Sequence, residues 1–188
     1  LRDVTLRGGG TGLFVAGPVR ASLRQVVLEG ASVFAAVAHG AGAALVADDV
    51  IVRAASAVSP RFGFAVRAGA NVDARRVAIR DVTLRGVVAL GVGSRGAIED
   101  AVIEGGDPVS AEDPFALFAG DGATLNVSRV VIRRFGGQGV GTSLLAGART
   151  RVTLRDVVVR DLRAPQNGTV TAALLASNSD VDAERLLF

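Results

Sequence analysis

The chain has 188 residues, a formal net charge of +3 and 49% hydrophobic residues. This apolar content argues against disorder, and the length suffices for one domain with a real core. The absence of cysteine excludes disulfides, thiol nucleophiles and thiolate metal sites. No apolar run reaches the roughly 18 residues that a membrane span needs, and so small a charge excess predicts no nucleic-acid partner.

One phrase recurs along the whole chain and is clearest at residues 151–161. Apolar residues there alternate with polar ones up to Leu154, the charged pair Arg155-Asp156 follows, and the alternation resumes at Val157. Such alternation places apolar side chains on one face of a β-strand. The break in phase at the charged pair predicts that two short strands meet there at a corner.

The polar residue just before each second strand serves as an anchor for comparing the copies. The anchors are Asp3, Gln25, Asp49, Arg76, Asp100, Arg129, Asp156 and Arg185. Their spacings of 22 to 29 residues are typical of solenoids. A short apolar run lies between successive anchors, at 12–17, 33–37, 62–66, 87–90, 115–118, 141–145 and 170–175. Each repeat is therefore predicted to carry about three short strands and glycine-rich corners, without a helix.

Three long polar corners, at 54–61, 105–114 and 161–168, follow the same point of the repeat. Equivalent points of a stacked coil lie above one another, so these corners are predicted to share one edge, which in repeat proteins is often the binding face. No change of composition marks a second domain, and we predict one domain over residues 1–188. Neither end resembles the polar cap that solenoids need, which predicts an excerpt of a longer chain.

The recurring Leu-x-Leu-Arg-Asp-Val-x-Val-Arg phrases, each followed by glycine and an apolar run, resemble the right-handed parallel β-helix repeats of the pectin-lyase-like superfamily. The resemblance covers essentially the whole chain. It implies an all-β, single-stranded right-handed parallel β-helix of about seven to eight coils. Val, Leu, Ile, Ala and Phe would stack inside and Arg, Asp and Glu would lie outside. Members include lyases, hydrolases, epimerases and surface adhesins, and the resemblance implies an extracellular or cell-surface protein. The bias toward Ala, Val, Arg and Gly, without lysine, is compatible with a bacterial source.

Pectate-lyase-like chemistry would need calcium-binding carboxylates and a basic residue over an acidic sugar. Calcium takes oxygen ligands, and the best cluster of carboxylates lies in the long corner after the fifth anchor. Its members are Glu104, Asp107, Glu112 and Asp113. Calcium bound there is the one cofactor that the sequence suggests, with Arg61 and Arg163 on the same edge. The alternative is a hydrophilic loop without a metal.

Hydrolase chemistry of the polygalacturonase kind would need several aspartates with a histidine and a basic partner. The adjacent carboxylates at 48–49 and 99–100 instead coincide with anchors, and the single histidine, His39, is predicted to be structural or at the surface. Residues 91–96 match Gly-x-Gly-x-x-Gly, but a strand follows where a dinucleotide site needs a helix. Tyrosine and tryptophan, the usual platforms for sugars, are absent.

These observations favour a non-catalytic scaffold or adhesion domain that presents a lateral face to polysaccharide or cell-surface protein partners. The alternative is a polysaccharide lyase or glycoside hydrolase that acts on an acidic polysaccharide, and a purely structural spacer is the third class. An enzyme should show several carboxylates or arginines converging in one groove, whereas a scaffold should show them spread evenly. The sequence identifies no catalytic residue and leaves the oligomeric state open.

Overall fold

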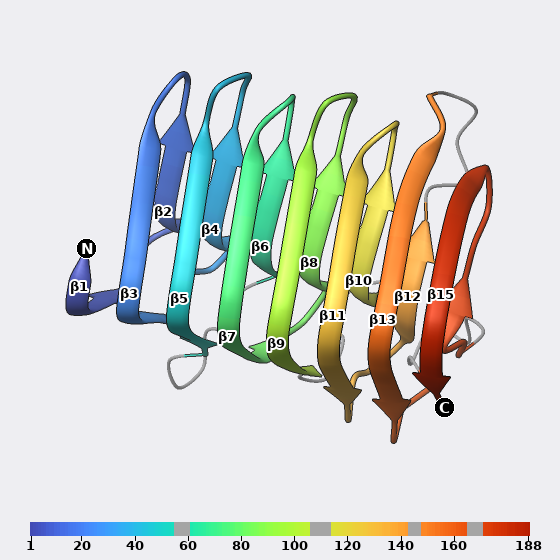
Figure 1. Ribbon diagram of the computed structural model, residues 1–188. Coiled ribbons are helices and arrows are strands. Elements are labelled where there is room, and N and C mark those ends of the chain that lie inside the picture. Colours follow the sequence, from blue (N-terminus) through green and yellow to red (C-terminus); the bar gives the residue numbers. More distant parts are fainter. Residues whose placement is uncertain (55–60, 106–113, 143–147, 165–170) are drawn as a thin grey trace.

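The computed structural model describes residues 1–54, 61–105, 114–142, 148–164 and 171–188. Its strands form two parallel sheets, one of eight long strands and one of seven short strands (Figure 1). Strands of the two sheets alternate along the chain, and each pairs with the equivalent strand of the next repeat. The predicted all-β parallel solenoid is confirmed, and the described residues contain no helix.

The long strands bear the anchors, and the short strands correspond to the apolar runs. The long strands are β1 (Arg2–Arg7), β3 (Arg20–Glu29), β5 (Ala44–Arg53), β7 (Asn71–Val82), β9 (Arg95–Gly105), β11 (Thr124–Arg133), β13 (Thr150–Arg160) and β15 (Ser179–Leu187). The short strands are β2 (Thr11–Ala16), β4 (Phe34–His39), β6 (Phe62–Arg67), β8 (Arg85–Leu90), β10 (Phe115–Gly120), β12 (Gln138–Thr142) and β14 (Leu174–Leu175). The stack makes about six turns, slightly fewer than predicted, because β1 and β14 are short.

Each long strand bends at its anchor. All eight anchors have a left-handed backbone, with φ between 50 and 55°, so the predicted corners are at these positions. Strand pairing nevertheless continues on both sides of the bend, as in Arg155↔Glu184 and Val157↔Leu186. Each repeat therefore contains one bent strand and one short strand, and the expectation of three short strands was wrong. We call the parts before and after the anchor the first arm and the second arm.

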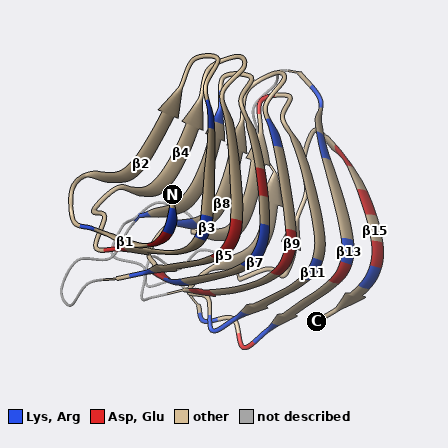
Figure 2. Ribbon diagram, turned by 60° about the vertical axis from the view of Figure 1, so that its left-hand side comes forward, with Lys and Arg blue, Asp and Glu red and all other residues tan. Residues whose placement is uncertain are grey.

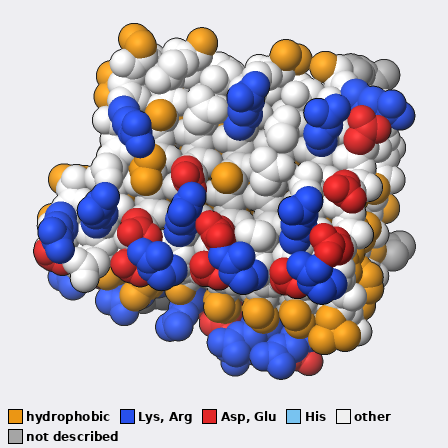
Figure 3. All heavy atoms as spheres, in the orientation of Figure 1, with side chains coloured by type: hydrophobic (Ala, Val, Ile, Leu, Met, Phe, Trp, Pro, Cys, Tyr) orange, Lys and Arg blue, Asp and Glu red, His pale blue; other side chains and the backbone are white. Residues whose placement is uncertain are grey.

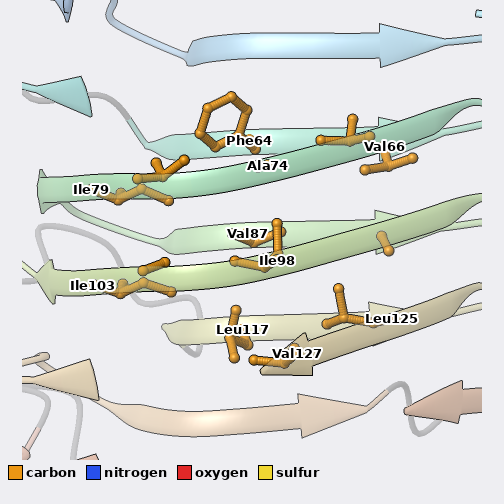
Figure 4. Packing of buried hydrophobic residues seen from close by; sticks show 14 of the residues in the cluster. Phe64, Val66, Ala74, Ile79, Val87, Ile98, Ile103, Leu117, Leu125 and Val127 are labelled. Carbon is orange, nitrogen blue, oxygen red and sulfur yellow. The ribbon is translucent and has the colours of Figure 1, made fainter. Parts of the chain in front are cut away.

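The core lies between the two sheets and follows the predicted alternation. In β7, Val72 and Ala74 point inward before the bend, and Val77 and Ile79 point inward after it. These side chains stack on their equivalents in the next coils and meet residues such as Phe64 and Val87 from the short strands (Figure 4). Burial of these aliphatic side chains in coil after coil is the main stabilising term of the fold.

The short strands are apolar on both faces. Their outward positions form a second apolar cluster, which contains Phe34, Phe62, Phe115 and Phe118 with Val37, Ala65 and Val88. The Phe34 and Phe62 rings stack with centroids 4.6 Å apart, and the Arg85 guanidinium lies 4.2 Å from the Phe118 centroid. Phe14 shares the column of Phe118. The expectation that phenylalanine stacks inside is correct for Phe64 and wrong for these five outward residues. A continuous apolar run does not indicate which face of the strand is directed toward the core.

Candidate binding face

The stacked anchors form a column of charges across the long-strand sheet (Figure 2). From the third anchor onward the column alternates strictly between aspartate and arginine. Since the parallel strands are in register, successive anchors lie about one strand spacing, ~4.8 Å, apart. Each such arginine donates to the aspartate of the preceding coil: Arg76 Nε to Asp49 Oδ1 at 2.7 Å, Arg129 Nε to Asp100 Oδ1 at 2.6 Å, and Arg185 Nε to Asp156 Oδ1.

A second column, of charged residues with one serine, lies beside the anchors, one residue earlier in each strand. Its members are Arg2, Arg24, Asp48, Arg75, Glu99, Ser128, Arg155 and Glu184. Arg75 lies 3.3 Å from Glu99, and the anchor Arg129 also pairs with Glu99. The two columns, here called the charge belt, together contain seven arginines and seven carboxylates. The belt is therefore formally neutral.

The belt changes the proton affinity of its carboxylates. Hydrogen bonds from the arginines hold the pKa of Asp49, Asp100 and Asp156 below the ordinary aspartate value of 3.8. A group whose pKa is depressed in the folded state stabilises that state above its unfolded pKa, and the contribution disappears as the pH falls through the folded value. Because all three side chains are solvent-exposed, each contribution is small and sensitive to salt.

We expect Asp100→Asn to lower the melting temperature at pH 7 and to have a smaller effect as the pH falls below about 4. Asparagine also adopts the left-handed backbone, so the substitution removes the charge and keeps the bend. Asp3→Asn is the matched control, because Asp3 is an anchor that stacks on the uncharged Gln25 and whose ion pair, with the adjacent Arg2 at 3.5 Å, lies within its own strand and does not join two coils. Thermal melts of both variants from pH 7 to pH 3 test this, and equal effects at all pH values would contradict it.

A shallow groove runs along the first arms beside the belt. Adjoining depressions in this face are lined by one outward side chain from each of five consecutive coils: Val46, Asp73, Ala97, Asn126 and Thr153. The column is open to solvent and crosses the strands, so the groove follows the solenoid axis. Its three polar members, Asp73, Asn126 and Thr153, offer hydrogen bonds to a ligand, and the last two lie one strand spacing apart. We call this feature the first-arm groove.

Arginines border the first-arm groove on the side away from the belt. Arg20, Arg95 and Arg151 occupy one outward column of the first arms, separated by uncharged residues, and Asp180 follows Arg151 in the last coil, where it also pairs with Arg149 at 3.3 Å. Figure 3 shows a row of basic side chains above a strip that contains few charged side chains, with the charge belt below that strip. Since the belt is neutral, this border supplies positive charge that no belt carboxylate offsets. The groove thus combines hydrogen-bonding groups with an arginine rim.

The predicted calcium set is described only in part. Asp107, Glu112 and Asp113 lie outside the described residues, so a calcium site in this corner stays a prediction. Glu104 ends the second arm of β9, with only 12% of its side chain exposed. Among the described residues, no three histidine or acidic side chains are grouped to hold a metal ion.

Arginines surround the Glu104 carboxylate. Arg134 donates to it at 2.6 Å, Arg133 pairs with it, and Arg80 lies 3.7 Å away. Burial alone would raise the pKa of Glu104, but the hydrogen bond from Arg134 and the charge of Arg133 outweigh burial and hold it below 4.5. The carboxylate is therefore ionised at neutral pH and compensated by three cations.

The other residues singled out from the sequence lie apart from the groove. His39 is exposed at the end of β4, where its ring stacks on Phe14 with centroids 6.2 Å apart. Gly91 and Gly93 have positive φ in the turn between β8 and β9, so this stretch is a corner that leads into a strand, as predicted. Arg163 donates to the carbonyl oxygens of Gly105 and Arg134, both at 2.9 Å.

The groove column was not predicted from the sequence. Its residues are outward-facing and differ chemically from coil to coil, so no motif marks them. Their position relative to the anchors could have identified them. Each lies three residues before an anchor, as Asp73 lies before Arg76 and Asn126 before Arg129. Outward positions counted from the anchors identify every exposed column of this sheet.

No protein-family model, curated protein or solved structure matches the chain. Within the described part of the chain, no helix has the length and apolar character needed to cross a membrane.

Proposed function

We propose that the protein is a non-catalytic surface or secreted scaffold that binds an acidic polysaccharide along the first-arm groove. The observation that carries this proposal is the arrangement of charge. The carboxylates of the long-strand sheet are distributed in rows and paired with arginines of neighbouring coils, as in Asp49–Arg76 and Asp100–Arg129. Acid–base catalysis on a sugar would instead require carboxylates that converge on one bond.

The shape and the rim of the groove support the choice of ligand. A groove that crosses five coils suits an extended polymer better than a compact small molecule, which binds in concave pockets. Guanidinium groups form bidentate contacts with carboxylates, and Arg20, Arg95 and Arg151 lie along one side. The acidic groups of the polymer would face these arginines while its hydroxyls contact Asn126 and Thr153.

The proposal includes the finer architecture that the repeat resembles. We infer a right-handed winding, because parallel strands joined by crossovers favour that hand, and hence the lateral groove of a pectin-lyase-like β-helix. Such a protein would act outside the cell, with calcium bound only where the corner containing Glu104 supplies oxygen ligands. Glycan contact along a preformed rigid face requires no conformational change.

The test measures binding to acidic polysaccharides such as polygalacturonate and alginate. We expect the triple variant Arg20→Gln, Arg95→Gln, Arg151→Gln to bind at least ten-fold more weakly, which corresponds to a loss of ~1.4 kcal/mol or more of binding free energy. A charge-matched triple variant, Arg53→Gln, Arg67→Gln, Arg160→Gln, lies outside the groove and should bind as the wild type does. Equal binding of the polysaccharide by both variants would refute the proposal that the first-arm groove is the binding site.

The same incubations distinguish a scaffold from an enzyme. Unsaturated products, followed by ultraviolet absorbance, or new reducing ends would replace the scaffold proposal with the lyase or hydrolase alternative. Binding without either product, with and without calcium, supports the scaffold. Calcium-dependent activity that is lost on neutralising Glu104, Asp107, Glu112 and Asp113 would place the chemistry in the long corner.

A further inference from the structure

The second arms carry an apolar stripe on their outer face. The residue two positions after the anchor points outward, and in seven consecutive coils it is aliphatic: Val27, Ile51, Ala78, Val102, Val131, Val158 and Leu187. Figure 3 shows hydrophobic side chains in a row below the charge belt. Outward positions of a one-sided sheet are usually polar. The core does not require this second-arm stripe, because inward neighbours such as Val26 and Val130 already fill the interior.

The two borders of the stripe differ in charge. On one side lies the neutral charge belt. On the other lies the column four residues after the anchors, Arg7, Glu29, Arg53, Arg80, Glu104, Arg133 and Arg160, here called the arginine row. It contains five arginines and two glutamates, and each glutamate lies between two arginines, as Glu29 does at 3.0 Å from Arg7 and 3.5 Å from Arg53. One border of the stripe is therefore positively charged.

These features favour a protein as the occupant of the stripe. Most of its aliphatic side chains are half-buried, Ile51 is 39% exposed, and Leu187 in the last coil is 64% exposed. A row that projects so little over most of its length is poorly suited to insertion into a lipid bilayer. A polysaccharide or a nucleic acid offers no continuous apolar surface that would cover the aliphatic stripe. A ligand that covers both must be apolar along one line and acidic beside it.

An amphipathic α-helix can present an apolar line with acidic residues beside it, and its pitch is close to the spacing of the coils. The helix pitch is about 5.4 Å, and the spacing of strands is about 4.8 Å, so a helix laid along the solenoid axis places roughly one turn over each coil. Residues at i, i+3, i+4 and i+7 form one apolar line, and acidic residues on one flank would then face Arg53, Arg80, Arg133 and Arg160. We propose that the second-arm stripe and the arginine row together bind an amphipathic helix of a partner protein with acidic residues along one flank.

The test uses a synthetic helical peptide of about 20 residues, long enough to span the stripe, with leucine on the apolar line and glutamate on one flank. We expect fluorescence anisotropy to show binding by the wild type and at least ten-fold weaker binding of the same peptide with lysine in place of glutamate. The affinity of the triple variant Ile51→Thr, Val102→Thr, Val131→Thr for the glutamate peptide should be at least ten-fold lower than that of the wild type. Threonine keeps the branched side chain that strands favour, and circular dichroism verifies the fold.

Further measurements separate this proposal from its competitors. The groove variant Arg20→Gln, Arg95→Gln, Arg151→Gln should bind the peptide normally, so failure of the polysaccharide proposal leaves this one standing. No binding of the acidic peptide, or equal binding by the threonine variant, would overturn the helix site. Tighter binding to phosphatidylserine vesicles than to the peptide, lost in the same threonine variant, would assign the stripe to a lipid surface instead.

Discussion

Replacing Val157 by aspartate is expected to prevent the protein from folding into the coil stack. Val157 is the first residue after the bend of β13, and only 1% of it is exposed. It lies in register between Val130 and Leu186 in the core. A carboxylate there would have no partner and no water, at a cost of about 4 kcal/mol or more. That is a large fraction of the stability of an ordinary domain, ~5–15 kcal/mol.

Val158→Asp is the control for this experiment. Val158 is the next residue of the same strand, but it points outward into the second-arm stripe and is half-buried. Its aspartate would reach solvent, so we expect this variant to retain the β-sheet circular-dichroism spectrum and a cooperative urea transition. The two variants have identical composition and differ only in the face that carries the charge. A folded Val157→Asp protein with an unchanged spectrum would show that the assignment of faces is wrong.

The sequence predicts the bends well because each depends on a local break in alternation. Two consecutive polar residues, such as Arg155-Asp156, interrupt a pattern of period two, and the second adopts the left-handed backbone in every repeat. Aspartate tolerates this conformation better than most residues. Arginine does not share that tolerance, and its use at Arg76, Arg129 and Arg185 follows from the aspartate that each contacts in the preceding coil.

Contacts between coils are harder to predict. The pairing of Arg76 with Asp49 spans 27 residues and that of Arg129 with Asp100 spans 29, and the lengths of the corners between them vary. The bend residues fix the register once they are known, but the sequence pattern alone presents these charges as a solvated face. For the same reason the neutrality of the belt, and hence the contrast with the arginine row, becomes visible only in the stacked structure.

The phenylalanines show a different limit. A strand that is apolar on both faces has no period of two, so Phe62-Gly-Phe64 does not indicate which ring faces the core. The structure places Phe64 inside and Phe62 outside, stacked on Phe34. The reason lies with the glycine and alanine that follow the first residue of each short strand: Gly12, Ala35, Gly63, Gly86, Ala116 and Gly139. This small-residue column lets each short strand lie close to the next short strand and to the core side chains of the long-strand sheet, where larger side chains do not fit.

Gly86→Val is therefore expected to destabilise the solenoid strongly. Gly86 needs no unusual φ, so the requirement for glycine is one of space. A Cβ at this position would lie 2.6 Å from the carbonyl oxygen of Ala116 and 2.7 Å from Cγ2 of Ile103. The Ala116 carbonyl belongs to β10, which pairs with β8, and it cannot retreat without disturbing that pairing. Forcing a branched side chain into this contact should cost about 3 kcal/mol or more.

Gly10→Val supplies the comparison, because a Cβ at Gly10 meets nothing within 4 Å and its φ is not positive. Urea unfolding should give a near-wild-type midpoint for Gly10→Val and a much lower midpoint for Gly86→Val. If both variants unfolded like the wild type, β8 could move away from β10 and β9 without a loss of stability. The small-residue column would then not limit how closely these strands pack. A large loss confined to Gly86→Val would instead show that the approach of successive coils is set by backbone contact. It would also explain why this column stays small while the aliphatic core positions beside it vary freely in size.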